Sequence, residues 1–140
     1  MRFWDSSALV PLIVYEKDSA FCAEAYRTDR EILIWTLTKV EVFSALCRRA
    51  RDKTLDEKIF EAARIRMNDL FENIYEVAAV DRVKERAMRL LRIHPLRAAD
   101  ALQLAAALVA TQEKVDRLPV MCLDDRLSEA AKLEGFEINP

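Results

Sequence analysis

The chain has 140 residues, of which 52% are hydrophobic and 33% charged, a balance that excludes disorder and predicts one domain spanning residues 1–140. Its 22 Lys and Arg residues against 24 Asp and Glu residues give a net charge of −2, so binding of a polyanion would depend on local basic groups. Gly135 is the single glycine and His94 the single histidine, which excludes glycine-rich phosphate loops and metal sites built from several histidines.

The first half of the chain alternates short apolar runs with helical periodicity. Ser6 or Ser7 is expected to cap a helix that tolerates Pro11 because this residue lies near the first turn. A Thr54-x-x-Glu57 capping box is expected to open a long helix. The predicted elements are a strand over 2–5, a helix over 6–14, a helix over 18–30, a strand over 32–35, a helix over 38–51 and a helix over 54–74.

The second half continues this alternation. The segment 98–111 is apolar nearly all round, which is typical of an interior helix, and Gly135 is expected just past a helix end. The predicted elements are a strand over 75–80, a helix over 82–93, a helix over 98–111, a strand over 120–123, a helix over 127–134 and an edge strand over 136–138. The alternation predicts a three-layer α/β fold, with a mainly parallel sheet of four to five strands and helices on both faces.

Four acidic residues stand out because they end a strand or have apolar neighbours. Asp5 and Asp124 follow two predicted strands, so both would project at the same edge of a parallel sheet. Asp100 lies in the apolar helix, on the same side as Gln103, and Glu41 has apolar neighbours on both sides. Burying an unpaired carboxylate costs several kcal/mol or more of folding free energy, so we expect a cation to lie near these acids.

Each acid also has an ordinary structural explanation. Asp5 and Asp124 could cap the helices that follow them, and Asp100 could cap the start of its own helix. Glu41 could reach back to the backbone amide of Thr38 in a capping box. Taken together, carboxylate ligands without His or Cys favour one or two Mg²⁺ or Mn²⁺ ions. Such ions activate water and stabilise the displaced oxygen at a phosphodiester.

The segments around these acids are distinctive as an ordered set. They are F-W-D-S-S-A-L-V-P-L with Asp5, T-L-T-K-V-E-V with Glu41, H-P-L-R-A-A-D-A-L-Q-L-A-A-A-L with Asp100, and C-L-D-D-R-L-S-E-A-A-K-L-E-G-F with Asp124. The set resembles the PIN domain, and most closely the VapC-type toxin ribonucleases of bacterial and archaeal toxin–antitoxin pairs, over the whole chain.

The resemblance implies a Rossmann-like sheet, endoribonuclease activity that depends on Mg²⁺ or Mn²⁺, homodimerisation, and inhibition by a VapB-type antitoxin. It implies that Asp5, Glu41, Asp100 and Asp124 are catalytic. Asp5, Asp100 and Asp124 would be the metal ligands, and a metal-activated water would attack the scissile phosphorus of RNA.

Neighbouring residues are expected to assist these acids. Ser7 matches a position where small polar residues support the first acid. Asp124 is preferred to Asp125 as the fourth acid, because the family pattern places Leu three residues after it. Cys122 stands where relatives commonly have Thr or Ser. Arg97 precedes the third acid by three residues, and it could contact RNA or pair with an acid.

Two basic clusters are candidates for RNA contact, although each could also be an ordinary solvated face. One is Arg82, Arg86 and Arg89 along a helix face, and the other is Arg48, Arg49, Arg51 and Lys53 near a helix end. The helices over 38–51 and 54–74 are expected to project as a pair. Phe60 and Phe71 would then face an antitoxin helix or belong to the core.

Two other functions stay open. A phosphoacceptor signalling module on a flavodoxin-like sheet would use Asp5 or Asp124, but no predicted strand ends in the Lys that such a module needs. A catalytically silent RNA-binding or interaction domain would show no stabilisation by divalent cations. No apolar run approaches the roughly 20 residues of a membrane span, and three scattered cysteines suit a reducing compartment, so we expect a cytoplasmic protein.

Overall fold

A parallel sheet of four strands lies at the centre of the computed structural model, which describes residues 1–140. The strands run in the order β3-β2-β1-β4. They are β1 (Arg2–Trp4), β2 (Ile32–Trp35), β3 (Tyr75–Val77) and β4 (Val120–Met121). β2 is a continuous apolar run, and Phe3 and Trp4 of β1 are both buried, as expected where both faces of a sheet are covered. The predicted α/β class and parallel sheet are confirmed.

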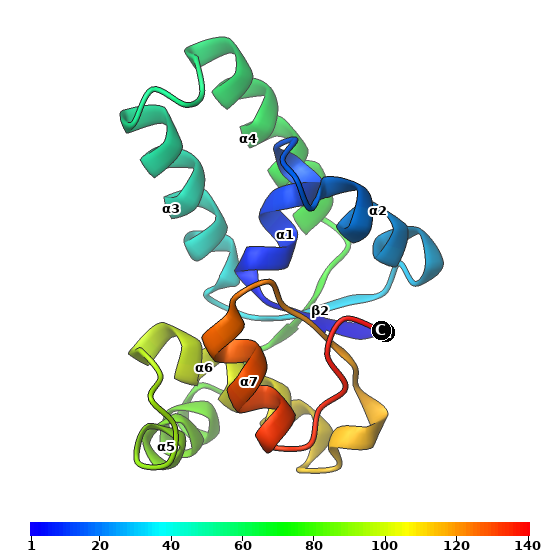
Figure 1. Cartoon of the computed structure of the whole chain (residues 1–140), viewed down its shortest axis with the longest axis vertical. Coiled ribbons are helices and arrows are strands. Elements are labelled where there is room, and N and C mark those ends of the chain that lie inside the picture. The colour runs from blue at the N-terminus through cyan, green and yellow to red at the C-terminus, as the bar shows by residue number, and fades with distance from the viewer.

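Alternate side chains along the strands separate the core into two parts. Trp4 and Ile34 pack under α1 (Ser6–Ile13), α2 (Ser19–Thr28), α3 (Thr38–Arg51) and α4 (Glu57–Phe71). Phe3 and Trp35 pack under α5 (Val80–Leu91), α6 (Ala98–Thr111) and α7 (Asp125–Leu133). Figure 1 shows the first group of helices above the sheet and the second group below it. The three layers are therefore helices, sheet and helices.

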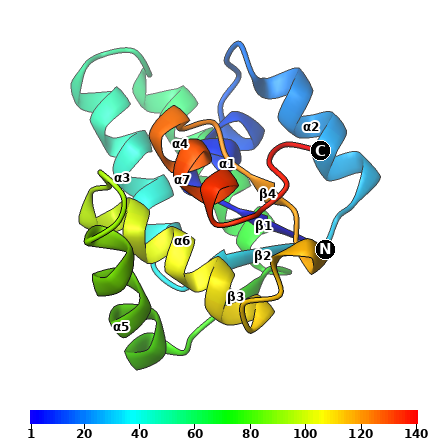
Figure 2. The same ribbon diagram turned by 60° about the horizontal axis from the view of Figure 1, so that its bottom comes forward.

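The connections between strands change face at one point in the sheet. The chain passes from β1 to β2, and from β2 to β3, through α1–α4 on one face. It passes from β3 to β4 through α5 and α6 on the other face. Neighbouring strands β1 and β4 (Figure 2) therefore flank the switch point, and ligands of open α/β sheets bind beyond the carboxyl ends of such strands.

Two helices match their predicted bounds, whereas several other elements differ. Both α3 and α6 begin and end at the predicted residues. β3 ends at Val77 and β4 at Met121, because each strand is followed closely by the start of a helix or a turn toward one. The expected edge strand forms only one bridge, between Ile138 and Val120, and the positive φ of 56° at Asn139 ends its extended conformation.

The beginning of α4 differs from its prediction. Asp56, and not a Thr54–Glu57 capping box, caps this helix, because its carboxylate accepts a hydrogen bond from the Ile59 amide at 2.8 Å. The Thr54 hydroxyl instead donates to the carbonyl of Arg49 near the end of α3, at 3.0 Å. Threonine therefore completes the preceding helix and does not open the next one.

The position of Pro11 also differs from its prediction. Pro11 lies inside α1, beyond the first turn, and the helix ends at Ile13 soon after it. The hydroxyl of Ser19 donates to the carbonyls of Pro11 and Val14, at 2.8 and 3.3 Å. These bonds satisfy carbonyls at the end of a short, buried helix.

Two further expectations concern the helix ends and the projecting pair. Gly135 follows α7 with φ of +100°, as predicted for the residue past a helix end. Helices α3 and α4 project together from the sheet in Figure 1. Phe60 and Phe71 are partly buried and pack against the core, so they do not lie free on that pair. No helix combines the length and apolarity required to cross a bilayer.

Candidate active site

The first acid lies directly beyond β1 at the switch point. Asp5 is 5% exposed, and its Oδ2 accepts hydrogen bonds from the amide of Ser7 at 2.9 Å and from the hydroxyl of Ser7 at 2.5 Å. The Ser7 hydroxyl also accepts a hydrogen bond from the Leu123 amide beyond β4, at 2.9 Å. Asp5 therefore caps α1, where Ser6 or Ser7 was expected to do so. Both Ser7 hydrogen bonds use Oδ2, and neither involves Oδ1.

The acid beyond β4 likewise uses one carboxylate oxygen to cap a helix, while its other oxygen takes no part in that contact. Asp124 caps α7 through Oδ1, which accepts a hydrogen bond from the Leu127 amide at 2.8 Å. Asp100 does not start its helix, because α6 already begins at Ala98; its Oδ2 reaches back to the Arg97 amide at 3.3 Å. In both residues, capping occupies one oxygen, so it is compatible with a ligand at the other.

The second acid is held by a residue from another helix. Oε2 of Glu41 accepts a hydrogen bond from Nε2 of Gln103 at 2.8 Å. The alternative in which Glu41 forms a capping box with Thr38 is wrong, because Leu37, not Thr38, is the N-cap residue of α3. Nε2 of Gln103 also donates to Oγ1 of Thr38 at 3.1 Å, and Oε1 of Gln103 lies 3.3 Å from the same hydroxyl. Gln103 is 1% exposed and Thr38 is fully buried. This network ties the start of α3 to α6.

Sequence reasoning placed Gln103 on the same helix side as Asp100 but assigned it no role. The available signal was its polarity within an otherwise apolar stretch of α6. Its partner Glu41 is 62 positions away in the chain, so their contact depends on how α3 and α6 pack.

The four acids influence one another electrostatically. Burial raises the pKa of Asp5, against the Ser7 hydrogen bonds that lower it, and the charge of Asp100 raises it further. Burial likewise raises the pKa of Glu41, against the hydrogen bond from Gln103, and the charges of Asp5 and Asp100 add to the effect. The structure therefore brings carboxylates from separate segments within electrostatic range.

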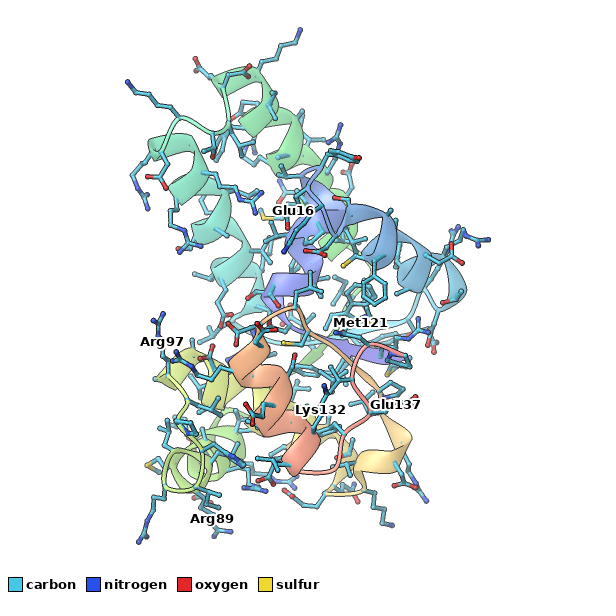
Figure 3. All side chains as sticks on the ribbon, in the orientation of Figure 1. Glu16, Arg89, Arg97, Met121, Lys132 and Glu137 are labelled. Carbon is cyan, nitrogen blue, oxygen red and sulfur yellow. The ribbon has the colours of Figure 1, made fainter.

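The third acid connects this group to Asp124. Burial raises the pKa of Asp100, and the charge of Asp124 raises it as well, whereas the Arg97 amide and the side chains of Arg97 and Arg126 lower it. Asp100 is therefore within electrostatic range of the acids that follow β1 and β4 and of two arginines. Figure 3 shows Arg97 beside the start of α6.

The oxygen donors fit a hard divalent cation. Asp5, Asp100 and Asp124 each have one carboxylate oxygen outside the hydrogen bonds described above, and such oxygens are the ligands that Mg²⁺ and Mn²⁺ prefer. No three His, Cys, Asp or Glu side chains are already arranged as a set of ligands. A shared ion would therefore require rotation of these side chains toward each other.

The expected auxiliary residues lie around the same acids. Arg97 and Asp125 line a cavity of about 390 Å³ together with Asp100 and Asp124, so both acids of the Asp124–Asp125 pair face the same space. Sγ of Cys122 lies 3.8 Å from Oδ2 of Asp5 and 3.8 Å from the Ser7 hydroxyl. Burial raises the pKa of Cys122 to about 12, which keeps a neutral thiol beside Asp5.

In the basic cluster of Arg82, Arg86 and Arg89, one arginine already forms ion pairs within the protein. Arg86 binds Glu134 at 2.9 Å and Glu113 at 3.1 Å, and Glu134 also binds Nε2 of His94 at 2.7 Å. His94 is buried in this network. Arg86 therefore ties α5 to the segments that follow α6 and α7 and is not a free group for RNA.

The raised pKa of Asp100 predicts a pH-dependent stability. The folded protein holds this proton more tightly than the unfolded chain, so the group stabilises the fold most below its unfolded pKa of 3.8. That contribution is lost as the pH rises through the raised value. Without divalent cations, we expect the thermal midpoint of the wild type to fall relative to that of Asp100→Asn as the pH rises from about 4 to about 7.

Thermal denaturation of both proteins over a pH series measures this difference. Groups far from Asp100 are the same in both proteins, so their contributions cancel in the comparison. A difference that stays constant with pH would contradict the placement of Asp100 among the other carboxylates.

The chain is similar in sequence to known proteins, and this similarity identifies its family. No family model matches the chain. Ribonuclease VapC45 of Mycobacterium tuberculosis (strain CDC 1551 / Oshkosh) and Ribonuclease VapC49 of Mycobacterium tuberculosis (strain ATCC 25618 / H37Rv) are each 30% identical to it over 138 residues. These residues cover 99% of this chain and 94% of each relative. With the parallel sheet and the acids beyond its strands, this similarity shows that the chain belongs to the VapC-type PIN-domain ribonuclease family.

Proposed function

We propose that the protein is a metal-dependent endoribonuclease and acts as the toxin of a toxin–antitoxin pair. What supports this proposal is that acids from separate segments influence one another's pKa near the switch point of the sheet: Asp100 with Asp5, Glu41 with both of these, and Asp124 with Asp100. Both relatives are named ribonucleases, which supports RNA as the substrate.

The carboxylates would divide the work of phosphodiester hydrolysis. Asp5, Asp100 and Asp124 would hold Mg²⁺ or Mn²⁺, which when bound supplies water activation and neutralises developing negative charge. Ser7 fixes Asp5 through two hydrogen bonds. Gln103 holds Oε2 of Glu41, and the Ser6 hydroxyl also contacts this carboxylate, so Glu41 is held in place to orient the attacking water and accept its proton.

The positive groups near the acids suit the substrate's charge. Arg97 and Arg126 line the same cavity as Asp100 and Asp124. A guanidinium group can bind two phosphate oxygens at once, so these residues would hold the scissile phosphate against repulsion from the carboxylates. Arg97 would then act on both the substrate and the third acid.

The assembly proposed here follows from the family. We propose that a VapB-type antitoxin inhibits the protein, that two copies form a homodimer, and that residues 1–140 act as one PIN domain. The two core clusters on opposite faces of one sheet support the single domain.

Cleavage of a labelled single-stranded RNA by the purified protein tests the function. We expect cleavage with Mg²⁺ or Mn²⁺, loss of cleavage with a chelator, and recovery when the cation is restored. RNA that stays intact with both cations would refute the proposal. Incubation with a small phosphodonor tests the phosphoacceptor alternative, and acid-labile phosphate on Asp5 or Asp124 would favour that alternative.

Thermal stability distinguishes a metal site from a silent binding domain. A cation at about 100 times its Kd stabilises a folded protein by about 2.7 kcal/mol. For a domain of this size we expect Mg²⁺ or Mn²⁺ to raise the thermal midpoint by roughly 10 °C at that saturation. An unchanged midpoint would favour the silent domain.

A further inference from the structure

A second cavity extends from the acidic site along α3. Its volume is about 650 Å³, and Glu41 and Ser6 line it near the acids. From there it continues past Ser44 to Arg48, with Lys17 of the α1–α2 loop among the lining residues. The cavity thus connects the proposed reaction centre to one of the two basic clusters of the sequence.

The periodicity of α3 creates this continuity. Glu41, Ser44, Ala45 and Arg48 follow the i, i+3, i+4, i+7 spacing, so they form one stripe along the helix. At 1.5 Å per residue, the Cα atoms of Glu41 and Arg48 lie about 10 Å apart along the axis. The stripe therefore changes from an acidic to a basic end over that distance.

Arg48 is the uncompensated cation of this cavity. Arg49 is paired with Glu16, and Nζ of Lys17 lies 3.9 Å from a carboxylate oxygen of Asp18. Figure 3 shows Glu16 on the segment that follows α1. Arg48 is exposed and takes part in no ion pair. Its guanidinium is therefore free to bind an external anion.

The lining favours the RNA backbone over the bases. None of the residues around the cavity is aromatic, so the cavity has no ring on which a base could stack. It offers a hydroxyl group at Ser44 and a guanidinium at Arg48, which are groups that commonly bind phosphate oxygens. Of the carboxylates in the lining, Glu16 and Asp18 face Arg49 and Lys17, and Glu41 lies at the other end of the stripe.

We propose that Arg48, with Ser44 beside it, forms a phosphate subsite that binds the single-stranded RNA backbone at a distance from the scissile bond. This inference rests on the proposed function, because the acids define where cleavage occurs. Because Arg48 lies about 10 Å along α3 from Glu41, a phosphate bound by Arg48 would be a different one from the scissile phosphate. The subsite would position the strand over the acids and leave the chemical step to them.

Binding of a labelled single-stranded RNA to the Asp100→Asn protein tests the subsite without cleavage. Arg48→Gln in this background is expected to weaken binding several-fold and to lower the slope of log affinity against log salt by about 1. Arg48→Lys should retain most of the affinity. Arg30→Gln is the matched control, because Arg30 is exposed, unpaired and located just before β2, at the opposite edge of the sheet.

The outcomes separate the subsite from the proposed function. Equal weakening by Arg48→Gln and Arg30→Gln would overturn the subsite, because net charge alone would explain both. Unchanged RNA binding with weakened binding of an acidic antitoxin segment would also overturn it and assign the cavity to a protein partner. If the wild type cleaves no RNA but Arg48→Gln still weakens RNA binding selectively, the subsite stands and the nuclease proposal fails. If the wild type cleaves RNA but Arg48→Gln does not weaken RNA binding, the nuclease proposal stands and the subsite fails.

Discussion

Asp100→Asn is expected to reduce RNA cleavage at least about 100-fold at saturating Mg²⁺ while the protein stays folded. The charge of Asp100 raises the pKa of Asp5, which follows β1, and the charge of Asp124, which follows β4, raises the pKa of Asp100. Asparagine retains an oxygen that can accept the hydrogen bond from the Arg97 amide, so α6 should keep its start. It loses the negative charge that a divalent cation requires. Asp5→Asn is expected to have the same effect.

Asp56→Asn provides a matched control for this experiment. Asp56 also caps a helix with its carboxylate, through the Ile59 amide at 2.8 Å, but it belongs to α4 and lines neither cavity of the site. Because Asn caps a helix about as well as Asp, this variant should cleave RNA at the wild-type rate. Wild-type cleavage by Asp100→Asn or Asp5→Asn would contradict the assignment, and circular dichroism checks that each variant is folded.

Gln103→Met is expected to reduce cleavage by about 10- to 100-fold, the range seen when a group that orients a metal ligand or catalytic residue is lost. Methionine is similar in volume and suits a buried position, so packing of α6 should be largely maintained. The variant loses the donor that holds Oε2 of Glu41 at 2.8 Å. The Glu41 side chain should then adopt other orientations, and a smaller fraction of protein molecules would have its carboxylate directed toward the substrate.

A double-mutant cycle with Glu41→Gln shows whether Gln103 acts through Glu41. If it does, adding Gln103→Met to Glu41→Gln should cost little further activity, because the carboxylate that Gln103 orients is already absent. Multiplicative losses in the double variant would mean that Gln103 acts by another route.

Stability needs a separate control, because Gln103→Met leaves the buried hydroxyl of Thr38 without its partner. Such a loss costs about 1–3 kcal/mol. Adding Thr38→Val removes that hydroxyl and should recover most of the stability, measured by chemical denaturation. Activity should stay low in this double variant, because Glu41 is still not held. Recovery of both properties together would indicate that Gln103 serves stability alone.

The sequence alone determined the elements whose pattern is local. The helical period of α3 and the apolar composition of the segment over 98–111 predicted these two helices, and the continuous apolar run of β2 predicted a strand covered on both faces. The ordered segments around the four acids were sufficient to indicate the family that the relatives in Mycobacterium tuberculosis then showed. Parallel strands with acids at their carboxyl ends also predicted where those acids would meet.

Only the tertiary structure decided which polar groups pair. The same side chain can complete a preceding helix or open the next one, as the Thr54 hydroxyl shows, because both uses satisfy a backbone group at similar energy. Glu41 bonds Gln103 and Arg86 bonds Glu134, each across many residues of chain, because packing of helices on the sheet brings them together. Hydrophobic periodicity reports which face of a helix is buried, but it carries no information about which distant side chain that face will contact.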